Sequence, residues 1–578
     1  MRSLLKQKLA DRFPHLDFDV LVPPNGKMGD YSTNLAFVLA KKENLPAQAG
    51  KDPMEVGEEL ASGLSRDKDL AGIFEKIETV KPGFINFYLN DSFLRKKLNE
   101  IGKDKGYGYN ETMKGKTVMV EYTDPNPFKL FHIGHLMSNI IGETISRLYE
   151  ASGAKVLRAN YQGDIGLHVA KAVWGMIQGS QNMPEESDSL EKKAEFLGSV
   201  YVSGAHAYES PEFKEKIEEI NDKIYKKDDP RINELYEKGK RWSLEYFETI
   251  YKKLGTKFDR YFFESETGGD GLKIVNENKK IFNESEDATV FKGEEYGLHT
   301  RVFINSKGLP TYEAKELGLN KNKFELYSPD LSIIVTGNEI NDYFRVLLKV
   351  MELTMPEVAA KTKHVSHGML RLPSGKMSSR TGDVITADSL IEQTKAKLPE
   401  SAASLERASL SETKRENEEA REKIAIGAIK YSILKQSPGH DIVFDFEKSL
   451  SVKGDSAPYL QYTYARLFNI LKKSEQADFQ LSIFNFQLLK HELELKLIKK
   501  LLTFPDCVLE SGEEIAPQHL ALYLYELSND ANRFYELVHV LDDENFERLN
   551  ARLMLVKTVA SVLKKGLSLL GVDVLERI

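Results

Sequence analysis

The fold is decided by residues 116–160, whose central stretch reads Glu121-Tyr122-Thr123-Asp124-Pro125-Asn126-Pro127-Phe128-Lys129-Leu130-Phe131-His132-Ile133-Gly134-His135. The β-branched run at 116–122 predicts a strand, and the prolines that follow end it. Apolar residues then recur at helical spacing from Leu136 to Leu148, and residues 155–160 predict a second strand. Strand, helix and strand in this order form the βαβ unit of a doubly wound parallel sheet, so we predict an α/β Rossmann-like domain.

Two motifs in this region and downstream of it are suited to binding triphosphate. His132 and His135 bracket Gly134 at the start of the predicted helix, where free backbone N–H groups and the helix dipole favour phosphate. Far downstream, Lys376 and Arg380 lie in a loop bounded by glycine, serine and proline, which could close over pyrophosphate. We expect Lys376 to carry the main charge and Arg380 to assist. Each motif alone also has an ordinary explanation, a chance turn or a solvated lysine.

Composition limits the classes of function that remain open. The chain has 578 residues, 41% apolar and 29% charged, which predicts several globular domains. The net charge of −8 means that nucleic acid would have to bind to a local basic surface. Cys507 is the single cysteine, which excludes intrachain disulfides and thiolate zinc clusters, and we predict no protein metal site. No run approaches the roughly 20 apolar residues of a membrane helix, so we expect a cytoplasmic protein without membrane contact.

The two motifs in this order resemble the HIGH and KMSKS signatures of class I aminoacyl-tRNA synthetases. The carboxylate of Glu121 and the Pro125-Asn126 pair before the first motif are similar to the arginyl-tRNA synthetase family. This resemblance implies a ligase that activates arginine with ATP and Mg²⁺ to arginyl-AMP and then transfers arginine to the 3′-terminal adenosine of tRNA. The family's second loop lysine is Ser379 here. The residues that the resemblance assigns to ATP are His132, Gly134, His135, Lys376, Met377, Ser378 and Arg380, of which His132, His135 and Lys376 are the predicted catalytic residues.

The resemblance covers nearly the whole chain and implies a multidomain enzyme, which we expect to be a monomer. The expected units are an α+β N-terminal tRNA-elbow-binding domain (1–110), the Rossmann-like catalytic domain (111–390) with a helical insertion at about 175–300, a helical connector (391–450), and an all-α anticodon-binding domain (451–578). We expect the last unit to be an independent bundle, joined through a hinge at 451–454.

Four residues are assigned to the amino acid by the resemblance. It places Glu121 and Asn126 near the amino and carboxylate end of arginine, and Tyr312 and Glu316 at the guanidinium. Carboxylates suit a planar group with five N–H donors. The family more often has aspartate where Glu316 stands. Without the resemblance, Glu121 could merely cap a strand, and Tyr312 and Glu316 could be an i,i+4 surface pair.

The helical C-terminal region carries the residues predicted to bind tRNA, which are Tyr459, Gln461 and Arg466. The neighbouring tyrosines at 459, 462 and 464 could fill the core of the bundle, or they could stack on unpaired anticodon bases.

Two alternative functions remain at this stage. The chain could be another class I aminoacyl-tRNA synthetase, or a catalytically silent tRNA-binding paralogue. The intact His132, His135 and Lys376 argue against a silent protein. Arginine differs strongly from other amino acids in charge and shape, so no editing site is required.

Overall fold

The computed structural model describes residues 1–23, 28–41, 50–373, 385–399, 410–476 and 485–576. The predicted loop residues Lys376, Met377, Ser378 and Arg380 lie outside these ranges.

An N-terminal sheet domain begins the chain. Its antiparallel strands have the order β1-β2-β4-β3, formed by Val20–Leu21, Tyr31–Thr33, Phe84–Leu89 and Phe74–Val80. The helices of this domain are α1 (Arg2–Ala10), α2 (Leu35–Ala40), α3 (Pro53–Ser65) and α4 (Lys68–Ala71). Buried Tyr31, Ile85 and Phe87 fill its core. Helix α5 (Asp91–Lys103) leads out of the domain and packs against α19 (Glu492–Leu502) and α22 (Phe546–Leu569) near the other end of the chain.

The central sheet is parallel throughout and has the strand order β12-β11-β5-β6-β7. These strands are Thr362–His367, Leu331–Gly337, Thr117–Glu121, Lys155–Gln162 and Arg260–Phe263. The chain runs outward from β5 to β7 on one side and returns through β11 and β12 on the other. The order therefore reverses beside β5, and the carboxyl ends of β5, β6 and β11 form the crevice where such sheets bind ligands. The predicted doubly wound α/β fold is confirmed.

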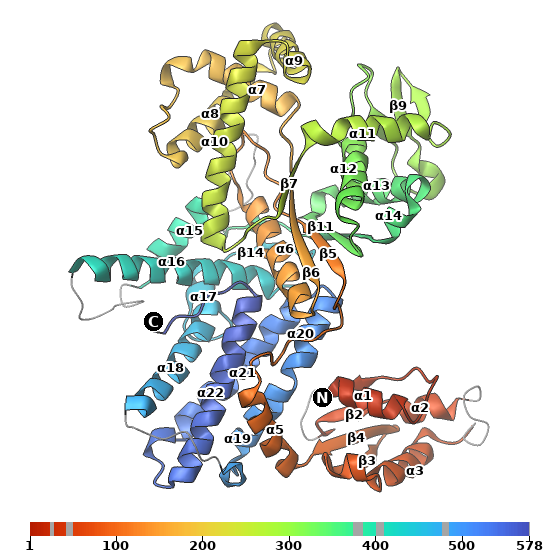
Figure 1. Ribbon diagram of the computed structural model, residues 1–578, viewed down its shortest axis with the longest axis vertical. Helices are drawn as coiled ribbons and strands as arrows, with labels where there is room; N and C mark the ends of the chain where they lie inside the picture. The colour runs from red at the N-terminus through yellow and green to blue at the C-terminus, as the bar shows by residue number, and fades with distance from the viewer. Residues whose placement is uncertain (24–27, 42–49, 374–384, 400–409, 477–484, 577–578) are drawn as a thin grey trace.

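Helix α6 (Ile133–Ala151) lies between this sheet and the C-terminal helices in Figure 1. It follows β5 and leads to β6, as the periodicity predicted. Almost every side chain along it is buried, because one side packs on the sheet and the other on α20 (Phe504–Glu513) and α21 (Pro517–Leu537).

The region expected to be one helical insertion at about 175–300 is divided by a strand of the central sheet. Helices α7 (Leu167–Gln178), α8 (Leu190–Ala207), α9 (Pro211–Lys226) and α10 (Pro230–Leu254) form a helical block with its own buried cluster. Strand β7 then rejoins the sheet. Helix α11 (Glu264–Glu277), a three-stranded sheet of β8 (Asn283–Ser285), β9 (Ala288–Phe291) and β10 (Arg301–Ile304), and α12 (Tyr312–Tyr327) follow. The expectation of a single helical insertion is corrected, because β7 pairs with β6 in the central sheet. The sequence pattern missed β7 because this strand has four residues and stands between two charged helical stretches.

The remaining elements connect the central sheet to the C-terminal helices. Helices α13 (Asn341–Thr354) and α14 (Pro356–Ala360) lie between β11 and β12. Strand β13 (Leu370–Arg371) pairs with β14 (Ile442–Val443). The helices near them are α15 (Ala387–Ala396), α16 (Leu410–Leu434) and α17 (Phe446–Leu450).

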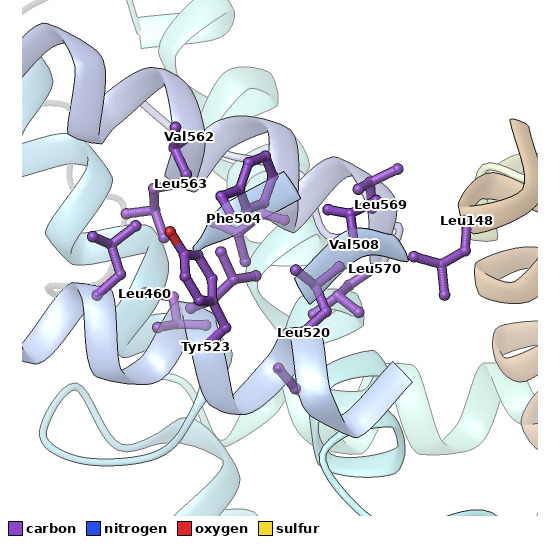
Figure 2. Close-up of a cluster of buried hydrophobic side chains, with 14 of the residues drawn as sticks. Leu148, Leu460, Phe504, Val508, Leu520, Tyr523, Val562, Leu563, Leu569 and Leu570 are labelled. Carbon is purple, nitrogen blue, oxygen red and sulfur yellow. The ribbon is translucent and has the colours of Figure 1, made fainter. Parts of the chain in front are cut away.

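The C-terminal bundle consists of α18 (Ala457–Gln476), α19, α20, α21 and α22, which confirms an all-α C-terminal domain. Figure 2 shows Leu460, Phe504, Leu520, Leu563 and their neighbours gathered in one apolar cluster, with Leu148 of α6 at its edge. Leu148 is fully buried. The bundle and the central sheet domain therefore share a hydrophobic core. The sequence predicted an independent bundle, and the packing does not support that prediction.

Candidate functional site

The two histidines of the first motif cap the start of α6. His132 is the N-cap residue, and its Nδ1 accepts from the backbone N–H of Gly134 at 3.1 Å and also from that of His135. The Nδ1 of His135 accepts from the backbone N–H of His132 at 3.3 Å, and the two rings stack with their centroids 3.6 Å apart. A side chain at Gly134 would collide with the His132 ring, so this arrangement requires glycine.

This capping changes which groups can reach a phosphate. The backbone N–H of Ile133 donates to the Ile385 carbonyl at 3.2 Å, and those of Gly134 and His135 are used by His132. The free backbone donors that the sequence suggested are therefore occupied. Since both Nδ1 atoms accept, each neutral imidazole carries its hydrogen on Nε2 and can donate with that atom.

Burial keeps both histidines uncharged. It lowers the pKa of His132 to about 4, and the nearby Lys129 ammonium adds to the effect. Burial also lowers the pKa of His135 well below its usual range, together with His132 and Lys129. At neutral pH both rings are hydrogen-bond donors, and the positive charge at this place comes from Lys129. Sequence reasoning missed Lys129, although it stands three residues before His132.

The described residues that follow the Lys376 loop in sequence contact the first motif. Thr386 forms an isolated antiparallel bridge with His132, and the backbone N–H of Ala387 donates to the Phe131 carbonyl at 3.0 Å. The sequence at the end of the loop is thus hydrogen-bonded to the residues that begin α6. This pairing places residues 385–387 beside His132.

Acidic side chains converge at the carboxyl ends of the neighbouring strands. Glu121, the last residue of β5, is 2% exposed, and its carboxylate lies 2.5 Å from the Lys323 ammonium of α12, which is 0% exposed. Glu316, two turns earlier on α12, is 6% exposed, and its Oε1 has no hydrogen-bond partner among the described residues. Burial raises the pKa of Glu316 to about 8, and the negative charge of Glu121 contributes. A buried carboxylate oxygen without a hydrogen-bond partner can accept from a cationic ligand.

Glu264 is the third acidic side chain at this edge of the sheet. Its carboxylate is buried and pairs with Lys315 of α12 at 2.7 Å. A side chain at Gly163 would collide with Asn126 Oδ1 and Glu264 Oε1, so Asn126 and Glu264 both face Gly163. Glu264 was missed because its region was interpreted as an insertion. The available signal was a carboxylate directly after the aromatic strand β7, at the same edge of the sheet as Glu121.

Tyr312 and Glu316 differ in their surroundings although both lie on α12. Tyr312 begins the helix and is 58% exposed, with its ring 5.4 Å from the Lys315 ammonium. The Tyr343 hydroxyl of α13 donates to the Tyr312 carbonyl at 3.3 Å. Tyr312 therefore lies at the exposed start of α12, and Glu316 is buried one turn further along it. They are not the simple surface pair that their spacing also allowed. We call the buried group of Glu121, Glu264 and Glu316 the acidic pocket.

Asp164 joins the elements that hold this pocket. It accepts from Tyr236 at 3.0 Å, from Lys240 at 2.7 Å, and from the hydroxyl and backbone N–H of Ser265. These contacts, led by the Lys240 bond, lower its pKa against the effect of burial. Since Ser265 is next to Glu264, Asp164 fixes the start of α11 and the orientation of Glu264.

A separate cavity of about 730 Å³ lies on the C-terminal bundle, between α18 and the end of α21. Arg466 is sandwiched between the rings of Tyr462 and Tyr535, with its guanidinium carbon 4.7 and 4.6 Å from their centroids. Both rings are more than a third exposed. A flat cation between exposed aromatic rings is a surface on which unpaired bases can stack.

Two of the three residues predicted to contact tRNA lie elsewhere. Gln461 is 0% exposed, and its Nε2 donates to the Asp573 carbonyl at 2.7 Å. The Tyr459 hydroxyl donates to Asn529 of α21 at 2.7 Å, and Tyr464 is buried. The expectation of a tRNA contact is corrected for Gln461, and Tyr459 packs against α21. They belong to faces of α18 that the rest of the bundle covers, whereas Arg466 and Tyr462 lie on its open face.

Two further classes of site were sought over the part of the chain that the structure describes. There, no three His, Cys, Asp or Glu side chains gather closely enough to hold a metal ion. No helix within the described ranges has the length and apolar character needed to cross a bilayer.

Family models match three parts of the chain. The catalytic domain of class I (R) tRNA synthetases matches residues 97–446, the arginyl-tRNA synthetase N-terminal domain matches 1–89, and the DALR anticodon-binding domain matches 460–578. An arginine–tRNA ligase of Fusobacterium nucleatum is 30% identical over 584 residues, covering 100% of this chain and 99% of the relative. One of Treponema denticola is 31% identical over 585 residues, covering 98% and 96%.

Solved structures agree in fold. The arginyl-tRNA synthetase of Thermus thermophilus superposes with a TM-score of 0.81 at 24% identity, covering 100% of both chains. That of Plasmodium falciparum gives 0.78 at 23% identity, covering 100% of this chain and 98% of the other.

Proposed function

The chain belongs to the arginyl-tRNA synthetase family, and from this premise we propose how its own residues carry out the reaction. It is an arginine–tRNA ligase, an aminoacyl-tRNA ligase of class I with arginine, ATP and tRNA as substrates. The proposal concerns which side chains bind each substrate. The observation that carries it is the buried carboxylate of Glu316, whose Oε1 has no hydrogen-bond partner among the described residues, in the acidic pocket at the sheet edge where α6 begins.

The acidic pocket would take the side chain of arginine. Glu316 would accept from the guanidinium, Glu264 would line the same pocket, and Tyr312 would close it from the exposed start of α12. A charge-assisted pair between a planar guanidinium and a carboxylate is strong and geometrically selective. Asn126 would hold the amino and carboxylate end of arginine, because it faces Gly163 beside Glu264. Glu121, already paired with Lys323, would set the charge of the pocket.

The first chemical step would take place at the start of α6. A carboxylate oxygen of arginine attacks the α-phosphorus of ATP, a new P–O bond forms, and pyrophosphate leaves with the electrons of the broken bond. His132 and His135 would donate from Nε2–H to phosphate oxygens, and Lys129 and Lys376 would offset the developing charge. Positioned donors of this kind lower the barrier without a covalent enzyme intermediate. In the second step, a hydroxyl of the terminal adenosine attacks the adenylate carbonyl, and AMP leaves.

Magnesium would come with ATP. The groups around His132 are imidazole and ammonium, which suit phosphate oxygens better than they suit a hard cation, so phosphates and water would hold the metal. When bound, it supplies charge neutralisation at the triphosphate.

The tRNA would span the chain. The exposed Tyr462, Arg466 and Tyr535 would stack on anticodon bases, and the N-terminal sheet domain would bind the tRNA elbow. We also propose that the chain acts in the cytoplasm as a monomer, since one copy carries both the acidic pocket and the base-stacking surface.

The deciding experiment is charging of bulk tRNA by the purified full-length chain, tested separately with each of the 20 amino acids. Arginine alone should be attached. Parallel ATP–pyrophosphate exchange, with and without tRNA, tests whether activation depends on tRNA. Attachment of another amino acid would contradict the arginine pocket. Tight tRNA binding with no charging would instead indicate a catalytically silent paralogue.

A further inference from the structure

Three carboxylates face one lysine in the acidic pocket. Glu121 comes from the end of β5, Asp124 from the loop after it, and Glu316 from α12. Asp124 and Glu316 are each close enough to Glu121 for electrostatic repulsion, and Lys323 attracts all three carboxylates. If the three carboxylates and Lys323 were all ionised, this cluster would carry two uncompensated negative charges. Burial makes such a state unfavourable, because the charges lose their hydration.

The elements packed around Glu316 offer no second positive charge to it. Glu264 on α11 is negative and is already paired with Lys315. Tyr161 on β6 and Tyr343 on α13 also face it, and burial raises the pKa of both hydroxyls well above the usual range, so both stay neutral. Asn320 donates to the backbone carbonyl of Glu316. Among the described residues, Lys323 is therefore the cation close to Glu316, and its ammonium is already paired with Glu121.

Backbone geometry fixes Asp124 in this cluster. Thr123 and Asp124 both have positive φ, 80° and 46°, in the left-handed region that side chains with Cβ rarely adopt. This turn brings Asp124 Oδ1 to the backbone N–H of Tyr161, from which it accepts at 2.7 Å. Asp124 remains partly exposed. A strained backbone that directs a carboxylate at a substrate pocket suggests a role in binding.

We propose that Asp124 is a third substrate-recognising carboxylate, and that the empty pocket holds a proton on Asp124 or Glu316 which is released when arginine binds. The inference rests on the proposed function of this pocket. Arginine brings a guanidinium and an α-ammonium, and these two cations would balance the two negative charges of the ionised cluster. Its α-carboxylate would face the start of α6, where it attacks ATP, and not the acidic cluster. The pocket would thus select for a doubly cationic ligand, because a ligand with one cation would leave one carboxylate protonated.

The pKa directions agree with this geometry. Burial, followed by Glu121, raises the pKa of Glu316 to about 8. The same two causes raise the pKa of Asp124 well above its usual range, opposed by the Tyr161 N–H and by Lys323. A bound guanidinium favours the ionised form and lowers these pKa values. Burial lowers the pKa of His132 to about 4 and that of His135 well below its usual range, so neither histidine titrates between pH 6 and 8.

Calorimetric titration of the full-length chain with arginine tests the proposal. The titrations are run at pH 7 in phosphate and in Tris, which differ in heat of ionisation, and the difference in observed heat counts the protons released. We expect about one proton per arginine, and a Kd that falls close to tenfold per pH unit from pH 6 to 7 and levels off near 8. Asp124→Asn should weaken binding at pH 8 and reduce the proton count at pH 7, because Glu316 loses a negative neighbour. Glu313→Gln is the control. Glu313 is a buried carboxylate on α12, the helix that carries Glu316, but it faces Arg301 at 3.6 Å.

The outcomes separate this inference from the function on which it rests. If arginine is charged onto tRNA but its binding releases no proton and its Kd is constant from pH 6 to 8, the proton coupling is wrong and the ligase assignment stands. A wild-type proton count and Kd in Asp124→Asn would remove Asp124 from the pocket. If arginine neither binds nor is charged, the proposed function itself fails. The proton count and the pH dependence of the Kd are measured on the wild-type chain, so they decide whether binding releases a proton even if Asp124→Asn folds poorly.

Discussion

The Lys323 ammonium lies 2.5 Å from the Glu121 carboxylate, and both side chains are almost completely buried. A pocket proposed to bind a cationic substrate thus contains a cation of its own. Lys323 pairs with Glu121, whereas Glu316 has no ion-pair partner among the described residues and its Oε1 has no hydrogen-bond partner there. The lysine compensates part of the negative charge without occupying the place at which arginine would bind.

Lys323→Met should destabilise the protein strongly. The substitution leaves Glu121 buried without its partner, and breaking a buried ion pair in this way costs about 3–5 kcal/mol. Thermal unfolding followed by circular dichroism should show a lower midpoint. The double variant Glu121→Gln, Lys323→Met should recover part of the loss, because it removes the unpaired charge. An unchanged midpoint in Lys323→Met would mean that water or a rearrangement already compensates Glu121.

Glu316→Gln should raise the KM for arginine steeply and leave the KM for ATP nearly unchanged. A neutral amide offers one acceptor oxygen instead of two and carries no charge, so the bidentate charge-assisted pair is lost. Hydrogen bonds to charged groups contribute about 1.5–3 kcal/mol, so an increase of roughly tenfold to a hundredfold is expected. Tyr312→Phe should cost less, because it removes one hydroxyl at the exposed start of α12. Steady-state charging kinetics with both variants measure this. An arginine KM like that of the wild type in Glu316→Gln would exclude it from the pocket.

Lys376→Ala should slow adenylate formation by about 10²–10³-fold and affect arginine binding far less. The reason is the loss of positive charge at the leaving pyrophosphate, which is the kind of contact that acts in the transition state. Rapid-quench measurement of the first turnover gives the rate. Lys361→Ala, an exposed lysine outside the loop, is the control. A wild-type activation rate in Lys376→Ala would refute the role of the loop.

Arg466→Met should weaken tRNA binding by roughly tenfold and leave the KM for arginine unchanged. The substitution removes the cation between Tyr462 and Tyr535, and base stacking on such surfaces is worth about 1–3 kcal/mol per base. Filter binding with cognate tRNA measures the loss. Lys472→Met provides a matched loss of one charge on an exposed position of α18 that does not line the cavity. Equal losses in the two variants would point to general electrostatics, and no loss in Arg466→Met would rule out the cavity.

A fragment ending at Leu450 should fail to form a stable catalytic domain. Without α18–α22, Leu148 and its neighbours on α6 lose the apolar surface that buries them, and each exposed leucine costs about 1.5–3 kcal/mol. The measurement is the soluble yield of the fragment and its binding of a hydrophobic dye. Leu148→Ala in the full chain should lower the unfolding midpoint for the same reason. A soluble fragment that unfolds cooperatively would show that the bundle is independent after all.

The sequence by itself determined the strand–helix–strand unit around His132, the parallel α/β domain and the helical C-terminal region. These features depend on local periodicity and turn chemistry, which a single chain segment records. The histidine motif was found for the same reason, since its residues are neighbours in sequence. The position of Glu121 at a strand end and of Arg466 on a helix also followed from local pattern.

Only the tertiary structure decided which charged residues meet. Glu264, Lys315 and Lys323 read as ordinary charged helix residues in sequence, and the sheet order brings them to the carboxyl ends of β5 and β6. The face on which Gln461 lies depends on which helices cover α18, so its burial could not be read from its spacing. The physical reason is the same in each case: periodicity records that one face of an element is buried, whereas the partner of a buried charge is set by elements distant in the chain, and that partner determines its ionisation.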